Sequence, residues 1–211
     1  MTGSRDPFPK QCQSAGSVAA VKTSRPRSAA ALAASALMLT ACGSGIVPSS
    51  GAQAPVPVAG CPTAAPATDT AAEWTLPGAT GSVAVTGSSD TTAPLVTVTP
   101  PLSVAETQVH TLQAGGGPVV SPTATVSVCY LGVNGRDGSV FDSSYQRGAP
   151  VDFPLDGVVP GFQKAIAGQT VGSTVAVAMT SADGYPQGQP GAGILPGDSL
   201  VFAIKILGAS G

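Results

Sequence analysis

The residue types that usually carry out acid–base, nucleophilic or metal chemistry are scarce in this chain of 211 residues. It contains one histidine, His110, and four cysteines, Cys12, Cys42, Cys61 and Cys129, with neither a CxxC pair nor a Cys/His cluster. A zinc site needs such a cluster, and a Ser/His/Asp triad would have to use His110, which no motif supports. We therefore expect no metal and no cofactor, and we interpret His110 as a solvated strand residue.

Charge divides the chain at Cys42. Residues 1–42 carry a net charge of +4, and the remainder carries a net charge of −6. An acidic segment with few Lys and Arg residues cannot neutralise many phosphates, so we exclude nucleic acid as a partner. The 27 Gly and 20 Pro indicate that much of the chain is linker or turn, which leaves one folded domain.

The N-terminal part has the pattern of an export signal. Basic residues at 22–27 precede an apolar segment at 29–39, which is too short to span a bilayer. Residues 39–42 read LTAC and resemble the lipobox of bacterial lipoproteins, in which the cysteine, here Cys42, is acylated. An ordinary signal peptide with an unrelated cysteine is the alternative. Residues 1–20 lack any pattern, and Val18 or Val21 is an alternative first residue.

We therefore expect residues 1–42 to be a lipoprotein signal peptide and residues 43–80 to be a disordered linker rich in Ala, Pro and Thr. The protein would be lipid-anchored on the extracytoplasmic face of the cell membrane. Trp74 is the only large aromatic residue of this linker, and we expect it to dock on the folded domain.

The elements that must position any site follow from the pattern after Gly81. Apolar or β-branched runs bounded by Gly, Pro and Asp predict strands of an antiparallel sheet at residues 82–85, 95–99, 107–112, 124–130, 175–179 and 200–207. One segment, residues 161–167, has the spacing of a short amphipathic helix. The sequence thus predicts an α+β domain over residues 81–211, in which one short helix covers the apolar face of a sheet.

Three segments, in order, carry a resemblance to a known family. They read VSVCYLG at 126–132, GSVFDSS at 138–144 with RGAPVDF at 147–153, and VVPGF at 158–162 followed by VG at 171–172 and LVF at 200–202. Together they resemble the FKBP-type peptidyl-prolyl cis-trans isomerases over about residues 123–207. The resemblance implies a twisted antiparallel sheet wrapped around a short helix, with an apolar hollow between them that receives a proline ring.

The resemblance also implies the residues of the site. Tyr130, Asp142 and Arg147 would form a network at the pocket wall, and the Tyr185 hydroxyl and Val159 N–H would donate hydrogen bonds to substrate carbonyls. The lining would comprise Tyr130, Phe141, Phe153, Val158, Val159, Phe162, Tyr185, Ile194 and Phe202. Taken alone, Phe153, Val158, Ile194 and Phe202 would be interpreted as core residues, and only their order within the motifs favours a pocket.

Three positions depart from the family pattern: Phe162 replaces a common tryptophan, Val151 stands where an aromatic is usual, and Pro186 follows Tyr185 in place of glycine. The implied activity is acceleration of X-Pro bond rotation in exported proteins, with macrolide inhibitors as further ligands and a monomer as the functional unit. The alternative is a lipid-anchored, non-catalytic chaperone or proline-peptide binding module on the same fold.

Two cysteines, Cys61 and Cys129, would keep their thiols after removal of the signal peptide and acylation of Cys42. In an oxidising compartment they could form a disulfide that ties the linker to the outer face of the sheet, or they could remain free thiols. The sequence leaves both alternatives open.

Overall fold

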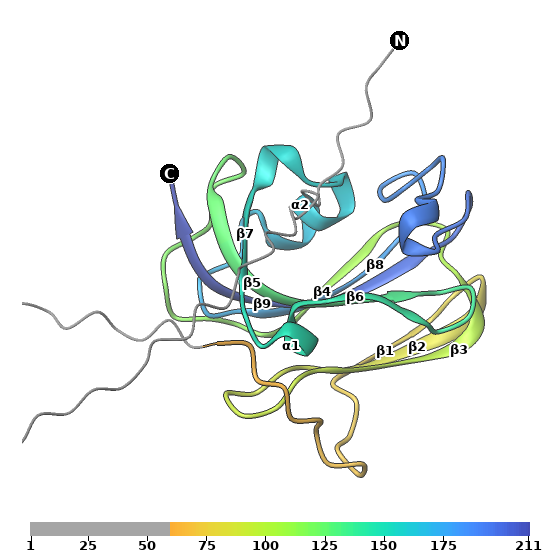
Figure 1. Cartoon of the computed structure of the whole chain (residues 1–211), viewed down its shortest axis with the longest axis horizontal. Coiled ribbons are helices and arrows are strands. Elements are labelled where there is room, and N and C mark those ends of the chain that lie inside the picture. Colours follow the sequence, from red (N-terminus) through yellow and green to blue (C-terminus); the bar gives the residue numbers. More distant parts are fainter. Residues whose placement is uncertain (1–59) are drawn as a thin grey trace, which may run out of the picture. The chain divides into compact units, whose positions relative to one another are not determined.

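Two antiparallel sheets make up the part of the chain that this computed structural model describes, residues 60–211 (Figure 1). The first sheet has the order β1-β2-β3 and consists of β1 (Trp74–Pro77), β2 (Thr80–Thr86) and β3 (Leu95–Ser103). The second has the order β4-β8-β9-β5-β6 and consists of β4 (Gln108–Gln113), β8 (Thr174–Met179), β9 (Leu200–Ser210), β5 (Thr125–Asn134) and β6 (Val140–Ser143), with β7 (Val151–Pro154) also paired to β5.

The helices of the described residues are short. They are α1 (Ser144–Arg147), α2 (Pro160–Ile166) and the 3-10 turns Leu155–Gly157 and Pro190–Ala192. Pro160 starts α2, where its missing N–H costs no helical hydrogen bond. None of these helices is long and apolar enough to cross a membrane.

Successive side chains of β9 point to opposite faces of the larger sheet, and their contacts show what covers each face. Phe202 contacts Phe162 of α2, whereas Val201 and Ala203 pack against the smaller sheet. Figure 1 accordingly shows α2 on one side of the larger sheet and β1–β3 on the other. We call the side that faces β1–β3 the outer face.

Small side chains on the outer face allow the two sheets to pack. The buried cluster between them combines residues of both sheets: Val83, Val85, Leu102, Ala176, Ala178, Val201 and Ala203. Because β8 and β9 contribute mainly alanines here, the larger side chains of β2 and β3 fill the space between the sheets. The predicted Trp74 docking is confirmed: its ring packs on this cluster and stacks on His110 with centroids 5.6 Å apart.

The predicted strands and the helix at residues 161–167 are confirmed, as is the mainly antiparallel architecture. The predicted extent of the linker is wrong at its C-terminal end, since β1 lies at Trp74–Pro77 and Cys61 is only 3% exposed. The reason is physical: β1 buries only alternate residues, Trp74 and Leu76, a pattern too short to recognise without its partner strand. Residues 1–59, including Cys42 and the predicted signal peptide, lie outside the described residues.

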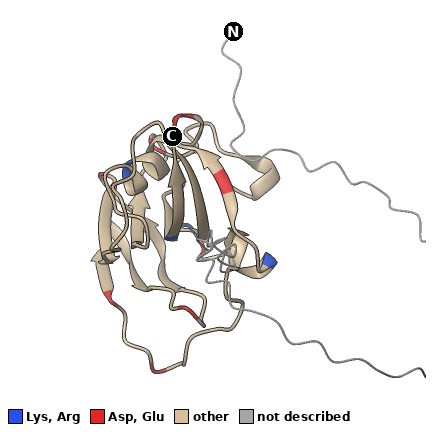
Figure 2. Ribbon diagram, turned by 90° about the vertical axis from the view of Figure 1, so that its left-hand side faces the viewer, with Lys and Arg blue, Asp and Glu red and all other residues tan. Residues whose placement is uncertain are grey.

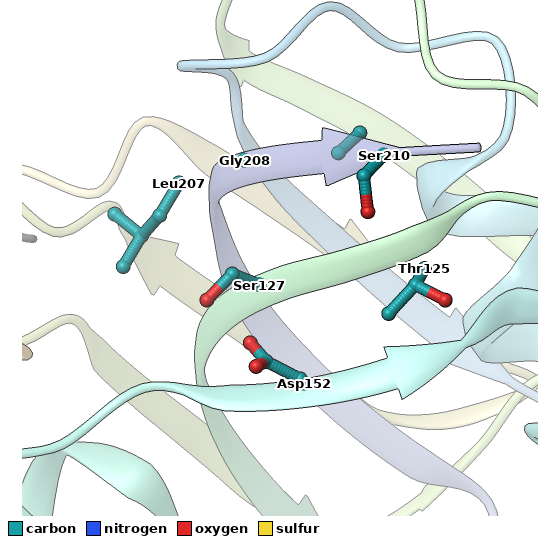
Figure 3. A pocket seen from close by; sticks show the side chains of 7 residues that line it. Thr125, Ser127, Asp152, Leu207, Gly208 and Ser210 are labelled. Carbon is teal, nitrogen blue, oxygen red and sulfur yellow. The ribbon is translucent and has the colours of Figure 1, made fainter.

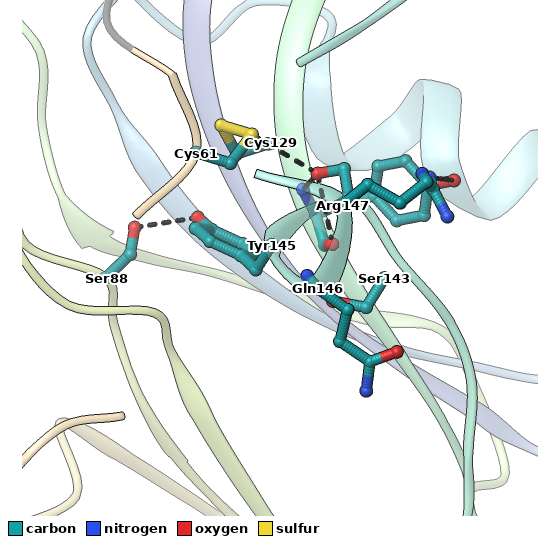
Figure 4. The surroundings of a disulfide bond; sticks show 9 residues. Cys61, Ser88, Cys129, Ser143, Tyr145, Gln146 and Arg147 are labelled. Atoms are coloured by element: carbon teal, nitrogen blue, oxygen red, sulfur yellow. Dashed lines mark hydrogen bonds between the residues drawn. A yellow bond between two sulfur atoms is a disulfide. The ribbon is translucent and has the colours of Figure 1, made fainter. Parts of the chain in front are cut away.

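Cys61 and Cys129 form a disulfide, so the pairing that the sequence left open is present in the structure. The bond fastens the segment before β1 to the outer face of β5 (Figure 4). Tyr145 of α1 packs beside the two cysteines, and its hydroxyl donates to Ser88 in the β2–β3 connection at 2.9 Å. The disulfide and Tyr145 therefore join both sheets at one end of the domain.

Candidate functional site

Five aromatic side chains converge from five elements on the face opposite β1–β3. They are Tyr130 of β5, Phe141 of β6, Phe153 of β7, Phe162 of α2 and Phe202 of β9. Phe202 contacts three of the other rings, with centroids 5.4 Å from Phe141, 5.4 Å from Phe162 and 6.4 Å from Tyr130. All six ring pairs among these residues are T-shaped or tilted, an arrangement that aromatic quadrupoles favour. We call this group the aromatic cluster.

Exposure divides the predicted site residues into two groups. Tyr130, Phe153, Phe162, Ile194 and Phe202 are buried, whereas Phe141, Asp142, Val158, Val159 and Tyr185 are half-buried. The aromatic cluster therefore has a buried base and reaches the surface at Phe141. A cluster of rings with a half-buried margin is typical of a site for an apolar ligand.

Two segments carry the remaining predicted residues. Val158 and Val159 directly precede α2, while Tyr185 and Ile194 lie in the β8–β9 connection, residues 180–199. The N–H of Gly161 donates to the Asp183 carbonyl at 2.8 Å, so the start of α2 and the beginning of this connection are neighbours. Ile194 pairs with Gln189 in an isolated bridge within the same connection.

A hydrogen-bonded network of three residues borders the aromatic cluster, as the resemblance implied. The Tyr130 hydroxyl donates to one carboxylate oxygen of Asp142. Arg147 Nη1 donates to the other oxygen at 2.6 Å, and Nη2 donates to the Tyr130 hydroxyl at 3.1 Å. Burial and the hydrogen bond to Asp142 raise the pKa of Tyr130 well above its ordinary value, so the phenol stays neutral in physiological buffers.

Gly132 is a site residue for which the sequence analysis assigned no role. A Cβ at this position would lie 2.7 Å from a ring carbon of Phe141 and 2.9 Å from one of Phe202. Only glycine lets both rings approach β5 this closely. The signal in the sequence was a glycine inside a strand that is otherwise apolar, at the end of the VSVCYLG motif.

Every basic side chain of residues 60–211 has a hydrogen-bonding partner, and three of the four hold segments around the site. Arg147 binds Asp142, Lys164 binds Asp183 at 2.7 Å, and Arg136 binds Asp198 at 3.3 Å, while Lys205 donates to the Gly172 carbonyl. Figure 2 shows how few basic segments the described part carries. Asp183 and Asp198 lie near the two ends of the β8–β9 connection, so these pairs fix the segment that carries Tyr185.

Acidification should weaken the Lys164–Asp183 ion pair. Hydrogen bonds from Lys164 and Thr107 lower the pKa of Asp183 below its ordinary value. A carboxyl group with a lowered folded-state pKa stabilises the fold fully above its unfolded value of about 4, and loses this contribution as the pH falls through the folded value. We expect Asp183→Asn to lower the free energy of unfolding by about 1 kcal/mol at pH 7 and to flatten its decline below about pH 4.

Urea unfolding between pH 3 and 7 measures this effect. Asp90→Asn is the matched control, because Asp90 is exposed and forms no ion pair with the described residues. Equal pH profiles for wild type and Asp183→Asn would contradict the prediction.

A hollow of about 340 Å³ lies away from the aromatic cluster (Figure 3). It is lined by residues from β5, β7 and β9: Thr125, Ser127, Asp152, Leu207, Gly208, Ala209 and Ser210. None of these residues belongs to the aromatic cluster or to the predicted site. We therefore assign the hollow no part in the site.

Comparison with known proteins identifies the family. The family described as FKBP-type peptidyl-prolyl cis-trans isomerase matches residues 117–207, which contain the whole aromatic cluster. The chain is 38% identical over 96 residues to the probable FK506-binding protein of Corynebacterium glutamicum, a match that covers 45% of this chain and 80% of that protein. The chain belongs to the family of FKBP-type peptidyl-prolyl cis-trans isomerases.

Two further relatives are similar over part of their length. The FKBP-type 22 kDa peptidyl-prolyl cis-trans isomerase of Escherichia coli is 37% identical over 100 residues, which are 47% of this chain and 48% of that protein. The chain thus spans about half the length of that relative. A crystal structure of a peptidyl-prolyl cis-trans isomerase from Pseudomonas syringae aligns with a TM-score of 0.45 and 29% identity, covering 50% of this chain and 76% of that one.

Proposed function

We propose that this chain is a peptidyl-prolyl cis-trans isomerase that accelerates rotation about X-Pro bonds in exported proteins. The observation that carries the proposal is the aromatic cluster, which lies entirely within the segment that matches the family. A proline ring is compact and apolar, and a cluster with a half-buried margin offers it a contact surface from which water is excluded. The Tyr130–Asp142–Arg147 network holds one side of that surface in position.

Catalysis on this proposal needs no covalent intermediate. Amide resonance opposes rotation with a barrier of about 18–20 kcal/mol. An apolar surface disfavours the charge-separated planar amide relative to the twisted amide, and donors placed for the twisted form bind it more tightly. Within residues 60–211 the N–H of Val159 donates to no acceptor, so it is available to a substrate carbonyl. The family resemblance implies the Tyr185 hydroxyl as the second donor.

An exchange experiment tests the proposal directly. NMR exchange spectroscopy on a short X-Pro peptide measures its cis–trans rate with and without catalytic amounts of the purified protein. We expect acceleration that saturates with peptide concentration. Peptide binding without acceleration would reject the isomerase and support the non-catalytic binding module, and absence of both would reject the site.

The pH dependence of the rate separates this mechanism from acid–base catalysis. Tyr130 has a raised pKa, and the single histidine, His110, pairs with Ala176 and therefore lies on the outer face, away from the aromatic cluster. We expect the isomerisation rate to stay constant from about pH 5.5 to 8 and to be unchanged by EDTA. A bell-shaped profile centred near neutrality would contradict this mechanism.

The location of the protein is part of the proposal. The LTAC motif at residues 39–42 supports acylation of Cys42, and the Cys61–Cys129 disulfide is consistent with an oxidising compartment outside the cytoplasm. Two or more acyl chains give stable attachment, whereas a single chain gives only marginal attachment. We expect the protein to fractionate with membranes and Cys42→Ala to move it to the soluble fraction. Wild-type protein in the soluble fraction would contradict the anchor.

The proposed substrates are exported proteins whose folding waits on a slow X-Pro step. Macrolides are proposed ligands of the same apolar surface, and we propose that the protein acts as a monomer. Peptide arrays of X-Pro sequences would define which residue before proline binds best.

A further inference from the structure

One edge of β5 pairs with two different strands, β7 and then β6, and the change of partner lies beside the aromatic cluster. Thr125–Val128 of β5 pair with β7, and Leu131–Val133 pair with β6, so Cys129 and Tyr130 have no strand partner on this edge. Between β6 and β7 the chain instead forms α1. An unpaired N–H in this buried position would be destabilising by about 1–3 kcal/mol.

Ser144 supplies the missing partner. Its side chain is fully buried, and its Oγ accepts a hydrogen bond from the Tyr130 N–H at 2.8 Å. The same oxygen lies 3.4 Å from Sγ of Cys61, so the disulfide covers it from behind (Figure 4). The serine hydroxyl is thus held between the backbone of β5 and the disulfide.

The helix that begins with Ser144 ends with Arg147. One end of α1 therefore holds the Tyr130 backbone, while the other end holds the Tyr130 hydroxyl and Asp142 through the guanidinium group. Given the isomerase function proposed above, we infer that Ser144 is a positioning residue: its hydrogen bond sets α1, and hence Arg147 and Asp142, in register with Tyr130. The Cys61–Cys129 disulfide supports this register by closing the space behind the hydroxyl.

Neighbouring serines provide a matched pair of variants. Ser143 is also buried and also serves α1, because its Oγ accepts from the Gln146 N–H at 3.2 Å, but its side chain bonds only to that amide within the described residues. Loss of α1 stability alone would affect Ser143→Ala and Ser144→Ala alike. Loss of the register between β5 and α1 would affect only Ser144→Ala.

We expect Ser144→Ala to lower kcat between about tenfold and 100-fold with little change in KM, since misplacement of a rigid site affects the transition state most. Ser143→Ala should keep kcat. In the free protein, Ser144→Ala should shift the Tyr130 amide resonance and speed solvent exchange of the Arg147 guanidinium protons, whereas Ser143→Ala should leave both unchanged.

Each outcome decides the inference. Unchanged Arg147 exchange in Ser144→Ala, or an equal loss of kcat in both variants, would overturn it. If the wild-type protein does not accelerate isomerisation, the proposed function fails, and the Arg147 exchange still decides whether Ser144 positions α1. If Ser144→Ala does not fold, the Cys61→Ala/Cys129→Ala variant replaces it. We then expect the Tyr130 amide resonance to shift and the Arg147 guanidinium protons to exchange faster. If neither changes, the inference is overturned.

Discussion

Phe202→Ala should lower kcat/KM for an X-Pro peptide about 100-fold, the equivalent of about 2.7 kcal/mol of lost transition-state stabilisation. Phe202 is 2% exposed and is the ring that contacts Phe141, Phe162 and Tyr130 at once. Its removal would leave a cavity in the base of the aromatic cluster and lower the free energy of unfolding by about 3–5 kcal/mol. Both peptide affinity and rate should fall, because the proline ring loses its main contact surface.

Two companion variants separate the loss of the site from the loss of stability. Ile206→Ala removes a fully buried side chain from the same face of β9 without touching the ring contacts, so it should destabilise the fold but keep peptide binding. Phe202→Leu retains most of the apolar volume and should lie between wild type and Phe202→Ala. Peptide titration and thermal unfolding measure both effects. Wild-type affinity in a folded Phe202→Ala protein would show that the aromatic cluster is not the binding site.

Removal of the disulfide should lower the free energy of unfolding by a large amount. Cys61 and Cys129 are 68 residues apart, and in the chain-entropy model a loop of this length corresponds to about 4 kcal/mol. For a domain of this size we expect Cys61→Ala/Cys129→Ala to lower the melting temperature by about 10 °C. The segment before β1 would be released first, because the disulfide is its covalent attachment to β5.

The fluorescence of Trp74 reports whether this segment is released before the rest of the domain unfolds. Trp74 is the single tryptophan of the chain and reports the docking of β1 through its stack on His110. Fluorescence and circular dichroism followed during thermal unfolding should coincide in the wild type, and the fluorescence transition should come first in the double variant. Free thiols located at Cys61 and Cys129 by mass spectrometry of the non-reduced wild type would contradict the disulfide itself.

The sequence by itself determined the elements whose patterns are local. Alternating residues such as Leu200, Phe202 and Ile204 predict a strand over a few neighbours, and the spacing of Phe162, Ala165 and Ile166 predicts α2 in the same way. The family resemblance carried by the motifs also implied that the five aromatic residues lie together, and their rings are in contact in the structure. Strand and helix periodicities depend on neighbours in the chain, so one sequence suffices to find them.

Only the tertiary structure decided how distant segments meet. The smaller sheet exists because Val83 and Val85 meet Ala176 and Ala178, more than ninety positions later, and no local pattern encodes that contact. Trp74 and Leu76 become partly buried only against that cluster, and Ser144 acquires its role only where β6 and β7 separate along β5. Burial of a side chain and the partner of a buried N–H depend on what lies opposite in space, and the fold alone determines this.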